Sequence, residues 1–464
     1  MHRLSIFLLS LAALVVPTTS WEASTSGNLA INVTSPSASA TETPGPSAAL
    51  SASPPYSCTT NRYVATNGSD SNNGTSPSTP WLTIQHANAS VPTAGTCINV
   101  VSGTYTSGSI TIDHGGNSAS PTGYVVYRCQ TLGGCKTITN AGNVPFWKLP
   151  TSYVMVDGFE VDCNNNTGYI GITTGPDAGA TAHHLWILNS TVHHCQLSGI
   201  QFNNSEYYWI LHSTFYNNSS GTSGIYGSGI SIYEPKVISG YTPTSQDNAW
   251  TPYKIIINYN VSHDNYNQQV GSENSDGNGV ILDDWRWTQN TGTPYTGQGL
   301  VLGNIVYHNG GDGIEAFLNT GATIANNTAY NNNWDTHNPG TWRADIAVQA
   351  SYNVTVVNNI AWAVTGSGIL SENQPFMGQD AVSDTNIWSN NIAYGNTNDN
   401  FSAPDTYPIP SNKNNTNPLL VNAPGNNFAL QGTSPAIGFG MAGSYFPPPP
   451  VDAGACSSAL SVCP

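Results

Sequence analysis

The chain has 464 residues, of which only 8% are charged, and its 26 Asp and Glu against 10 Lys and Arg give a net charge of −16. This balance argues against a nucleic-acid partner, because a phosphate-binding surface needs clustered Lys and Arg. The 12 Trp and 23 Tyr are more than a disordered chain usually carries, so we expect a large folded domain.

Residues 1–20 are typical of a secretory signal peptide. His2 and Arg3 supply the charged start, residues 6–16 form an apolar run, and small residues follow at the cleavage position. The apolar run is too short to span a membrane, and no later segment reaches about 18 consecutive apolar residues. The sequence therefore predicts a secreted, extracellular protein without a membrane span.

Residues 21–55 are rich in Ser, Thr, Ala and Pro and contain almost no large apolar side chains, which is typical of a disordered linker. We expect the folded domain to span residues 56–446. Residues 447–464 begin with a run of prolines and are predicted to form a C-terminal tail.

Eight cysteines are an even number in an exported chain, so disulfides are expected. Cys129 and Cys135, and likewise Cys456 and Cys463, are close enough for local bridges, whereas spacing leaves the pairing of the other cysteines open. No Cys-x-x-Cys pair appears, which argues against a zinc or redox site.

A short pattern recurs between residues 187 and 395. Two apolar residues are followed by a polar anchor, two alternating positions and then His, Tyr or Asn, as in "ILNSTVHHC", "VLGNIVYHN" and "IANNTAYNNN". The anchors, spaced 23, 46, 45, 23, 32 and 32 residues apart, are Asn189, His212, Asn258, Gly303, Asn326, Asn358 and Asn390. Self-similarity at a period of this length indicates a solenoid.

A second pattern lies between these repeats and consists of Gly, a β-branched residue and an alternating stretch. It reads "SGIQF", "SGISIY", "NGVIL", "DGIEAF" and "SGILS". Each unit therefore holds short strands separated by Asn- and Gly-rich turns, and no window shows the 3.6-residue apolar period of a long helix. This combination favours an all-β, single-stranded parallel β-helix. A β-propeller would need blades of about 40 to 50 residues with four strands each, for which these strands are too short.

The few acids recur near the strands of the second pattern. Asp276 precedes one such strand, Asp312 and Glu315 bracket the next, Asp345 begins the third and Glu372 follows the fourth. Residues of neighbouring coils stack at about 4.8 Å, so we expect these carboxylates to gather on one face. Such a group suits Ca²⁺, which takes about six to eight oxygen ligands. The alternative is that these acids cap turns or hydrogen-bond across coils.

The run from Leu197 to Asn333 resembles the pectate lyases of polysaccharide lyase family 9 in the order of its motifs, "SGIQFNNSEYYWILHSTFYNN", "SHDNYNQQVGSENSDGNG", "GLVLGNIVYHNGGDGIEAF" and "TIANNTAYNNN". The resemblance implies a right-handed parallel β-helix that cleaves acidic pectin by calcium-assisted β-elimination. It also implies that Asp276, Asp312 and Glu315 bind Ca²⁺. The family's Asp-Gly motif matches Asp276, and its Asp-Asp-Gly-x-Asp motif matches "GDGIE", with Gly in place of one Asp.

The family's catalytic base is a Lys one or two coils further on. The only basic residue in the corresponding segment here, "TWRADI", is Arg343. The resemblance therefore implies that Arg343 is the base, and the alternative is that Arg343 only forms an ion pair with Asp345.

Four residues near the acids are predicted to bind the substrate. Lys254 and Arg286 supply positive charge in a region with few other cations. Trp285 and Trp342 suit stacking against sugar rings, with burial in the core as the alternative.

Two histidine pairs and one aspartate pair offer other chemistry. His183–His184 and His193–His194 are expected in turns of the coil, with metal binding as the alternative. Asp283–Asp284 could form the acid pair of a glycoside hydrolase. The Gly-His-Gly and Arg-x-Lys motifs of pectin hydrolases on this fold are missing from the sequence.

The sequence thus predicts a secreted, monomeric polysaccharide lyase that acts on an acidic polysaccharide with Ca²⁺ as cofactor. The alternatives are a uronan epimerase or glycoside hydrolase on the same fold, and a non-catalytic carbohydrate-binding surface protein.

Overall fold

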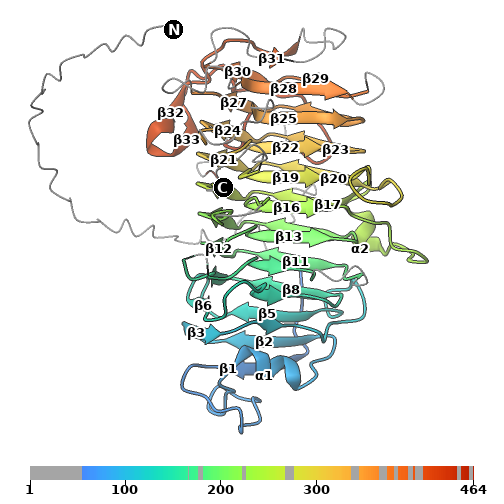
Figure 1. Ribbon diagram of the computed structural model, residues 1–464, viewed down its shortest axis with the longest axis vertical. Coiled ribbons are helices and arrows are strands. Elements are labelled where there is room, and N and C mark those ends of the chain that lie inside the picture. Colours follow the sequence, from blue (N-terminus) through green and yellow to red (C-terminus); the bar gives the residue numbers. More distant parts are fainter. Residues whose placement is uncertain are drawn as a thin grey trace, which may run out of the picture. The chain divides into compact units, whose positions relative to one another are not determined.

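Each coil of the chain places one short strand on each of three faces, and successive coils stack (Figure 1). The computed structural model describes residues 55–165, 167–175, 181–221, 226–266, 276–335, 344–364, 374–380, 385–395, 401–402, 411–446, 451–458 and 463. All of them belong to one unit, residues 44–464. The predicted signal peptide, nearly all of the predicted linker and the prolines at 447–450 lie outside the described residues.

Sheet A comprises β1 (Thr60–Val64), β2 (Thr96–Val100), β5 (Val125–Cys129), β8 (Val154–Asp157), β11 (Leu185–Leu188), β14 (Tyr208–Leu211), β17 (Tyr253–Asn258), β20 (Gln298–Leu302), β23 (Ala322–Ala325), β26 (Val354–Val357) and β29 (Ile387–Ser389). Sheet B comprises β3 (Gly103–Ser107), β6 (Cys135–Thr139), β9 (Phe159–Asp162), β12 (Thr191–His193), β15 (Thr214–Tyr216), β18 (Val261–His263), β21 (Ile305–Tyr307), β24 (Thr328–Tyr330), β27 (Ile360–Trp362) and β30 (Ile392–Tyr394).

Sheet C comprises β4 (Ile110–Thr111), β7 (Trp147–Lys148), β10 (Ile172–Thr173), β13 (Ile200–Asn203), β16 (Ile230–Tyr233), β19 (Val280–Asp283), β22 (Ile314–Phe317), β25 (Ala344–Ser351), β28 (Gln374–Asp380) and β31 (Phe401–Ser402). The remaining elements are the helices α1 (Ile84–Ala89) and α2 (Ser245–Asn248), the 3-10 turn η2 (Ala423–Gly425) and the antiparallel pair β32 (Leu420–Asn422) and β33 (Asn427–Leu430).

The predicted fold class, a right-handed parallel β-helix, is confirmed. The chain visits sheets A, B and C in turn, and neighbouring strands within each sheet pair in parallel. No helix among the described residues is long and apolar enough to cross a membrane.

The core lies between the three sheets, because alternate residues of each strand point inward. In sheet A the inward positions stack in register from coil to coil, for example Ile187, Ile210, Ile257 and Val301. These side chains have no exposed surface. Each buried aliphatic side chain contributes about 1.5–3 kcal/mol through removal of its apolar surface from water.

Ladders of asparagine side chains fill the turns. Between sheets A and B each side-chain carbonyl accepts the backbone N–H of the preceding rung at 2.8–3.0 Å, through Asn260, Asn304, Asn327, Asn359, Asn391 and Asn412. Between sheets B and C a second ladder runs through Asn218, Asn265, Asn309 and Asn332. It ends on Asp345, whose Oδ1 accepts the backbone N–H of Asn332 at 3.0 Å. The Asn repeats of the sequence therefore satisfy buried backbone groups.

The predicted anchors mark the turn after sheet A, with one exception. Asn189, His212 and Asn326 adopt positive φ there, which Asn tolerates better than most residues. In the third unit the residue with positive φ is Tyr259, not Asn258 as predicted. Asn258 pairs with Leu211 as the last residue of its strand, so the anchor falls one position later.

The strands of the second pattern form sheet C as predicted for "SGIQF", "SGISIY", "NGVIL" and "DGIEAF", which become β13, β16, β19 and β22 in register. The next strand is β25, and the one after it is β28, which begins at Gln374. Both Glu372 and the motif "SGILS" lie outside the described residues, so the place of Glu372 after that strand stays a prediction.

Much of the C-terminal segment, residues 411–446 and 451–458, lies against the outer face of sheet B, whereas Tyr445 and Phe446 pack against apolar residues of sheet A. Its apolar side chains Leu420, Phe428 and Ala453 are buried against Tyr307 and Tyr330. A backbone hydrogen bond from the Gly454 N–H to the Asn358 carbonyl adds to this contact. Part of the predicted tail is thus packed on the coil.

Four disulfides join the eight cysteines. The predicted local bridges Cys129–Cys135 and Cys456–Cys463 are both present. The other two, which spacing left open, are Cys58–Cys97 and Cys163–Cys195.

Candidate functional site

Two carboxylates project from the outer face of sheet C on neighbouring strands. Ile314 and Ala316 of β22 lie in the core, so Glu315 between them points outward. By the same alternation Asp283, the last residue of β19, also points outward. Because Ile281 pairs with Glu315, Asp283 is the diagonal neighbour of Glu315, at a distance typical of about 7–8 Å for such positions.

A chain of hydrogen bonds across coils holds Asp312 and Glu315. Asn278 Nδ2 donates to Glu315 Oε2 at 3.0 Å, and Asn278 Oδ1 accepts the Asp312 backbone N–H at 2.7 Å. In the next coil, the Ala344 backbone N–H donates to Asp312 Oδ1 at 2.9 Å. Both carboxylates are therefore oriented by backbone and amide groups of adjacent coils.

The carboxyls of Asp276, Asp283, Asp312 and Glu315 form one electrostatic group, the acid cluster. Burial, and then the charges of Asp312, Asp276 and Asp283, raise the pKa of Glu315 well above its ordinary value. Burial, and then the charge of Asp276, raise the pKa of Asp283 well above its own. Of the three residues that the sequence predicts to meet, Asp276 and Asp312 thus lie close enough for their charges to act on Glu315.

Asp283 is the member of this cluster that sequence reasoning did not place there. It is half-buried as a residue, yet its Oδ1 is enclosed and has no hydrogen-bond partner among the described residues. The signal was its position, two residues beyond the outward position of Glu315 in the aligned "NGVIL" and "DGIEAF" motifs.

Asp284 has a different role from its neighbour. Its φ is 43°, and its carboxylate accepts the backbone N–H groups of Thr288 at 2.8 Å and Gln289 at 2.6 Å. Asp284 therefore closes its own turn, and Asp283–Asp284 does not form a facing acid pair.

Three of the predicted substrate-binding residues, Trp285, Lys254 and Arg286, contact other groups of the protein. Trp285 has no exposed surface and donates its indole N–H to the Ile232 carbonyl at 3.1 Å, so it is a core residue whose ring a sugar cannot reach. Lys254 Nζ lies 2.9 Å from Oε1 of the buried Glu206. Arg286 Nη1 donates to the Ala350 carbonyl at 2.8 Å. Arg343 and Trp342 lie outside the described residues.

Both histidine pairs lie at turns, as expected. His184 and His194 adopt φ of 56° and 59°, and in each pair the two Nδ1 atoms are 2.6 Å apart. His184 Nε2 contacts Asp247 of α2 at 3.1 Å. Within the described parts of the chain, the set Asp162, His193 and His194 is the one group of His, Cys, Asp or Glu whose ligand atoms all lie within 4.8 Å of one another. No three carboxylates of the acid cluster, which lies within the described residues, have ligand oxygens that all lie within 4.8 Å of one another.

No family model matches the chain, and no curated protein matches it. Solved structures similar to it include pectate lyase Pel9A, with a TM-score of 0.48 and 16% identity over 87% of this chain and 97% of that one. A rhamnogalacturonan lyase matches with a TM-score of 0.43 and 12% identity over 73% and 74% of the two chains. The A-module of the mannuronan C-5 epimerase AlgE4 from Azotobacter vinelandii matches with a TM-score of 0.35 and 12% identity over 71% and 94%. Likenesses at this level do not assign an activity to this chain.

Proposed function

We propose that the chain is a secreted polysaccharide lyase that cleaves an acidic, uronate-containing polysaccharide by cation-assisted β-elimination. The observation that carries this proposal is the acid cluster, in which burial and the charges of neighbouring carboxyls raise the pKa of Glu315 and of Asp283. Acids are scarce in this chain, and such a concentration on one face is costly unless a cation or protons offset the repulsion. The motif order shared with family 9 pectate lyases supports the same conclusion.

The residues present fit Ca²⁺, which prefers carboxylate and carbonyl oxygens. Asp276, Asp312 and Glu315 would hold it, and the enclosed Oδ1 of Asp283 offers a further oxygen without another partner among the described residues. A bound cation would supply positive charge to stabilise the dianion that forms when the proton beside the uronate carboxylate is removed.

The chain's own side chains and backbone groups would orient the carboxylates, remove the proton and bind the substrate. Asn278 and the Ala344 N–H fix the orientation of Glu315 and Asp312. Arg343, the residue before Ala344 in sequence, is proposed as the base that takes the proton. Arg286, whose Nη1 donates to the Ala350 carbonyl, is proposed to pair with a substrate carboxylate through its other N–H groups.

The test is the ultraviolet absorbance of the unsaturated sugar that β-elimination leaves, measured on a panel of uronate polysaccharides with and without a chelator. We expect product on at least one substrate, loss of activity with chelator, and recovery with Ca²⁺. Glu315→Gln and Asp312→Asn should weaken the Ca²⁺ response at least tenfold, whereas the exposed Asp113→Asn should not. The proposal would be contradicted if no uronan gave an unsaturated product, or if the activity were the same with and without chelator.

A glycoside hydrolase is the second candidate, and one observation favours it. The pKa values of Asp283 and Glu315 are both raised, which favours a protonated carboxyl on this face, as a general acid requires. A hydrolase would release reducing ends without ultraviolet absorbance and without a need for Ca²⁺.

A further inference from the structure

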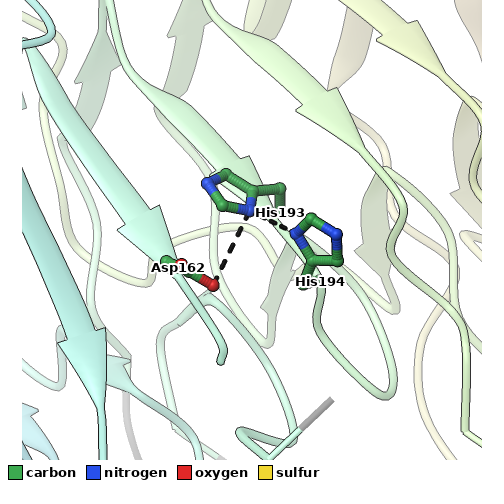
Figure 2. A group of neighbouring side chains, drawn as sticks. All are labelled: Asp162, His193 and His194. Atoms are coloured by element: carbon green, nitrogen blue, oxygen red, sulfur yellow. Dashed lines mark hydrogen bonds and ion pairs between the residues drawn. The ribbon is translucent and has the colours of Figure 1, made fainter. Parts of the chain in front are cut away.

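We propose that Asp162, His193 and His194 form a binding site for a divalent transition-metal ion such as Zn²⁺ on the outer face of sheet B (Figure 2). The site lies on a different face from the acid cluster and does not depend on the proposed lyase activity. Its nitrogen and oxygen donors distinguish it from the oxygen-only acid cluster. The cysteine pattern of the sequence does not bear on it, because no cysteine would be a ligand.

The three ligand groups converge on one point. The Nδ1 atoms of His193 and His194 are 2.6 Å apart, and Asp162 Oδ1 is 3.7 Å from His193 Nδ1. Figure 2 shows the two rings turned toward each other above the aspartate. His193 and Asp162 are direct neighbours across β9 and β12.

Consecutive residues of a strand normally point to opposite faces, so two adjacent histidines should not meet. Here β12 ends at His193, and His194 adopts a φ of 59°. This left-handed turn brings the second imidazole back to the side of the first. Positive φ is uncommon for residues other than Gly, although Asn, Asp and His adopt it more readily than most, and it is the reason that His194 reaches the site.

A disulfide fixes the two segments that carry the ligands. Cys163 follows Asp162, Cys195 follows His194, and these two cysteines are bonded to each other. Together with the strand pairing, this bond orders both halves of the site before any ion arrives. A preorganised set of ligands is what tight metal binding requires.

The surroundings of His193 match those of a metal ligand. Its other ring nitrogen, Nε2, lies 3.2 Å from Glu160 Oε1, and a carboxylate at that position commonly orients a ligating histidine. Lys136 Nζ contacts Glu160 at 2.9 Å and Asp162 Oδ2 at 2.7 Å. Asp162 thus uses Oδ2 for Lys136, while Oδ1 faces the histidines and also accepts the Asn164 backbone N–H at 2.8 Å. Tyr216 stacks on His193 with ring centroids 4.7 Å apart.

Two imidazoles and one carboxylate suit Zn²⁺, and also Ni²⁺ or Cu²⁺, better than Ca²⁺. With metal–nitrogen bonds of about 2.0–2.1 Å in a tetrahedron, the two nitrogens would stand about 3.4 Å apart. The half-buried ring of His194 would have to move by less than about 1 Å to allow this. Three protein ligands leave the fourth position for water.

The chain contains its own control. His183 and His184 share the 2.6 Å distance between Nδ1 atoms and the positive φ of the second residue. In the described residues, however, no carboxylate completes a three-ligand group at that pair. If two close histidines were enough, both pairs would bind metal.

The experiment is calorimetric titration of the chelator-treated full chain with Zn²⁺. We expect one ion per chain, bound with an affinity that falls at least tenfold in His194→Asn and in Asp162→Asn. Asn is chosen at position 194 because it tolerates positive φ and stands at the equivalent turn positions Asn217 and Asn331. His183→Asn should leave the affinity unchanged.

Lys136→Met is a further test, because a gain in Zn²⁺ affinity is not expected if Asp162 and the two histidines have only a structural role. Lys136 is a cation that already neutralises Asp162, so its removal should raise the affinity for Zn²⁺. Circular dichroism and the melting temperature would confirm that each variant is folded. Absence of saturable Zn²⁺ binding to the folded wild type, an unchanged affinity in His194→Asn, or an equal loss in His183→Asn would overturn the proposal.

Discussion

Asp345 places a carboxyl at the end of a buried asparagine ladder. Asp345→Asn measures how much ionisation of that carboxyl lowers the free energy of unfolding. Its Oδ1 accepts the Nδ2 and the backbone N–H of Asn332, at 2.6 and 3.0 Å. Its Oδ2 is buried and has no hydrogen-bond partner among the described residues. Burial raises the pKa of this carboxyl from 3.8 to about 7, although the hydrogen bonds from Asn332 oppose the shift.

The direction of the pH dependence follows from this difference. The unfolded chain releases the proton near pH 3.8, whereas the folded protein keeps it up to about pH 7. The free energy of unfolding therefore falls as the pH rises between these values, by about 1.4 kcal/mol per pH unit and about 4 kcal/mol in total. Above this window both states are ionised and the loss stays constant.

The side-chain amide introduced by Asp345→Asn does not titrate and has nearly the size of the protonated carboxyl. The variant and the wild type should therefore have similar free energies of unfolding near pH 3.8. Toward higher pH the variant should become the more stable protein, by up to about 4 kcal/mol above the window. The assay is urea denaturation of both proteins at pH values below, within and above the window, in chelator. At the exposed Asp113, a hydrogen bond from Asn88 is the main cause that lowers the pKa, so Asp113→Asn should show no gain at high pH.

A difference between Asp345→Asn and the wild type that does not change with pH would refute the reasoning. It would mean that Asp345 is solvated in solution or that its proton is not held in the folded state. A variant that loses stability relative to the wild type as the pH rises would refute it more strongly, because the sign would be reversed.

Other positions test the fold and the site. Asn304→Ala removes the partner of the Asn260 N–H and of the Ile257 carbonyl in the core, so it should lower the free energy of unfolding by about 3–5 kcal/mol in urea denaturation. The exposed Asn427→Ala should lower it by less than about 1 kcal/mol. Equal losses in the two variants would argue against a stabilising role of the ladder. Replacing Cys163 and Cys195 together by Ser opens a link across 32 residues and should lower the free energy of unfolding by about 3–4 kcal/mol, and a melting temperature insensitive to this change would argue against the bridge. Trp285→Ala should cost about 3–5 kcal/mol by leaving a cavity, whereas Trp334→Ala, 38% exposed in the wild type, should cost far less; loss of turnover in well-folded Trp285→Ala would return Trp285 to substrate binding.

Much of the fold could be predicted because its signals are local and repeated. Strand alternation, Gly before a β-branched residue and Asn at turns recur in each coil, and a register that holds in one coil holds in the next. The exception at Asn258 arose where the units are longest. Tyr259 and Asn258 both fit the pattern by type, and only the pairing of Asn258 with Leu211 decides between them.

The candidate site was less predictable, since its contacts cross coils at distances the sequence does not fix. The pairing of Lys254 with Glu206 depends on residues 48 positions apart, and the burial of Trp285 depends on how its turn folds back. Asp283 was visible as a residue but not as a neighbour of Glu315, because strand register had to be known first. The sequence placed His193–His194 at a turn, but the approach of Asp162 from the preceding coil depends on strand pairing that had to be known first.

The C-terminal segment has a consequence for how the protein is made. Tyr307, Tyr330 and Ile360 lie in one buried cluster with Leu420, Phe428 and Ala453, which come later in the chain. During synthesis, the growing end of the coil therefore presents apolar side chains that the later residues do not yet cover. Such exposed side chains are a target for chaperones and a route to aggregation between nascent chains. Folding is complete only when the C-terminal segment packs over these side chains.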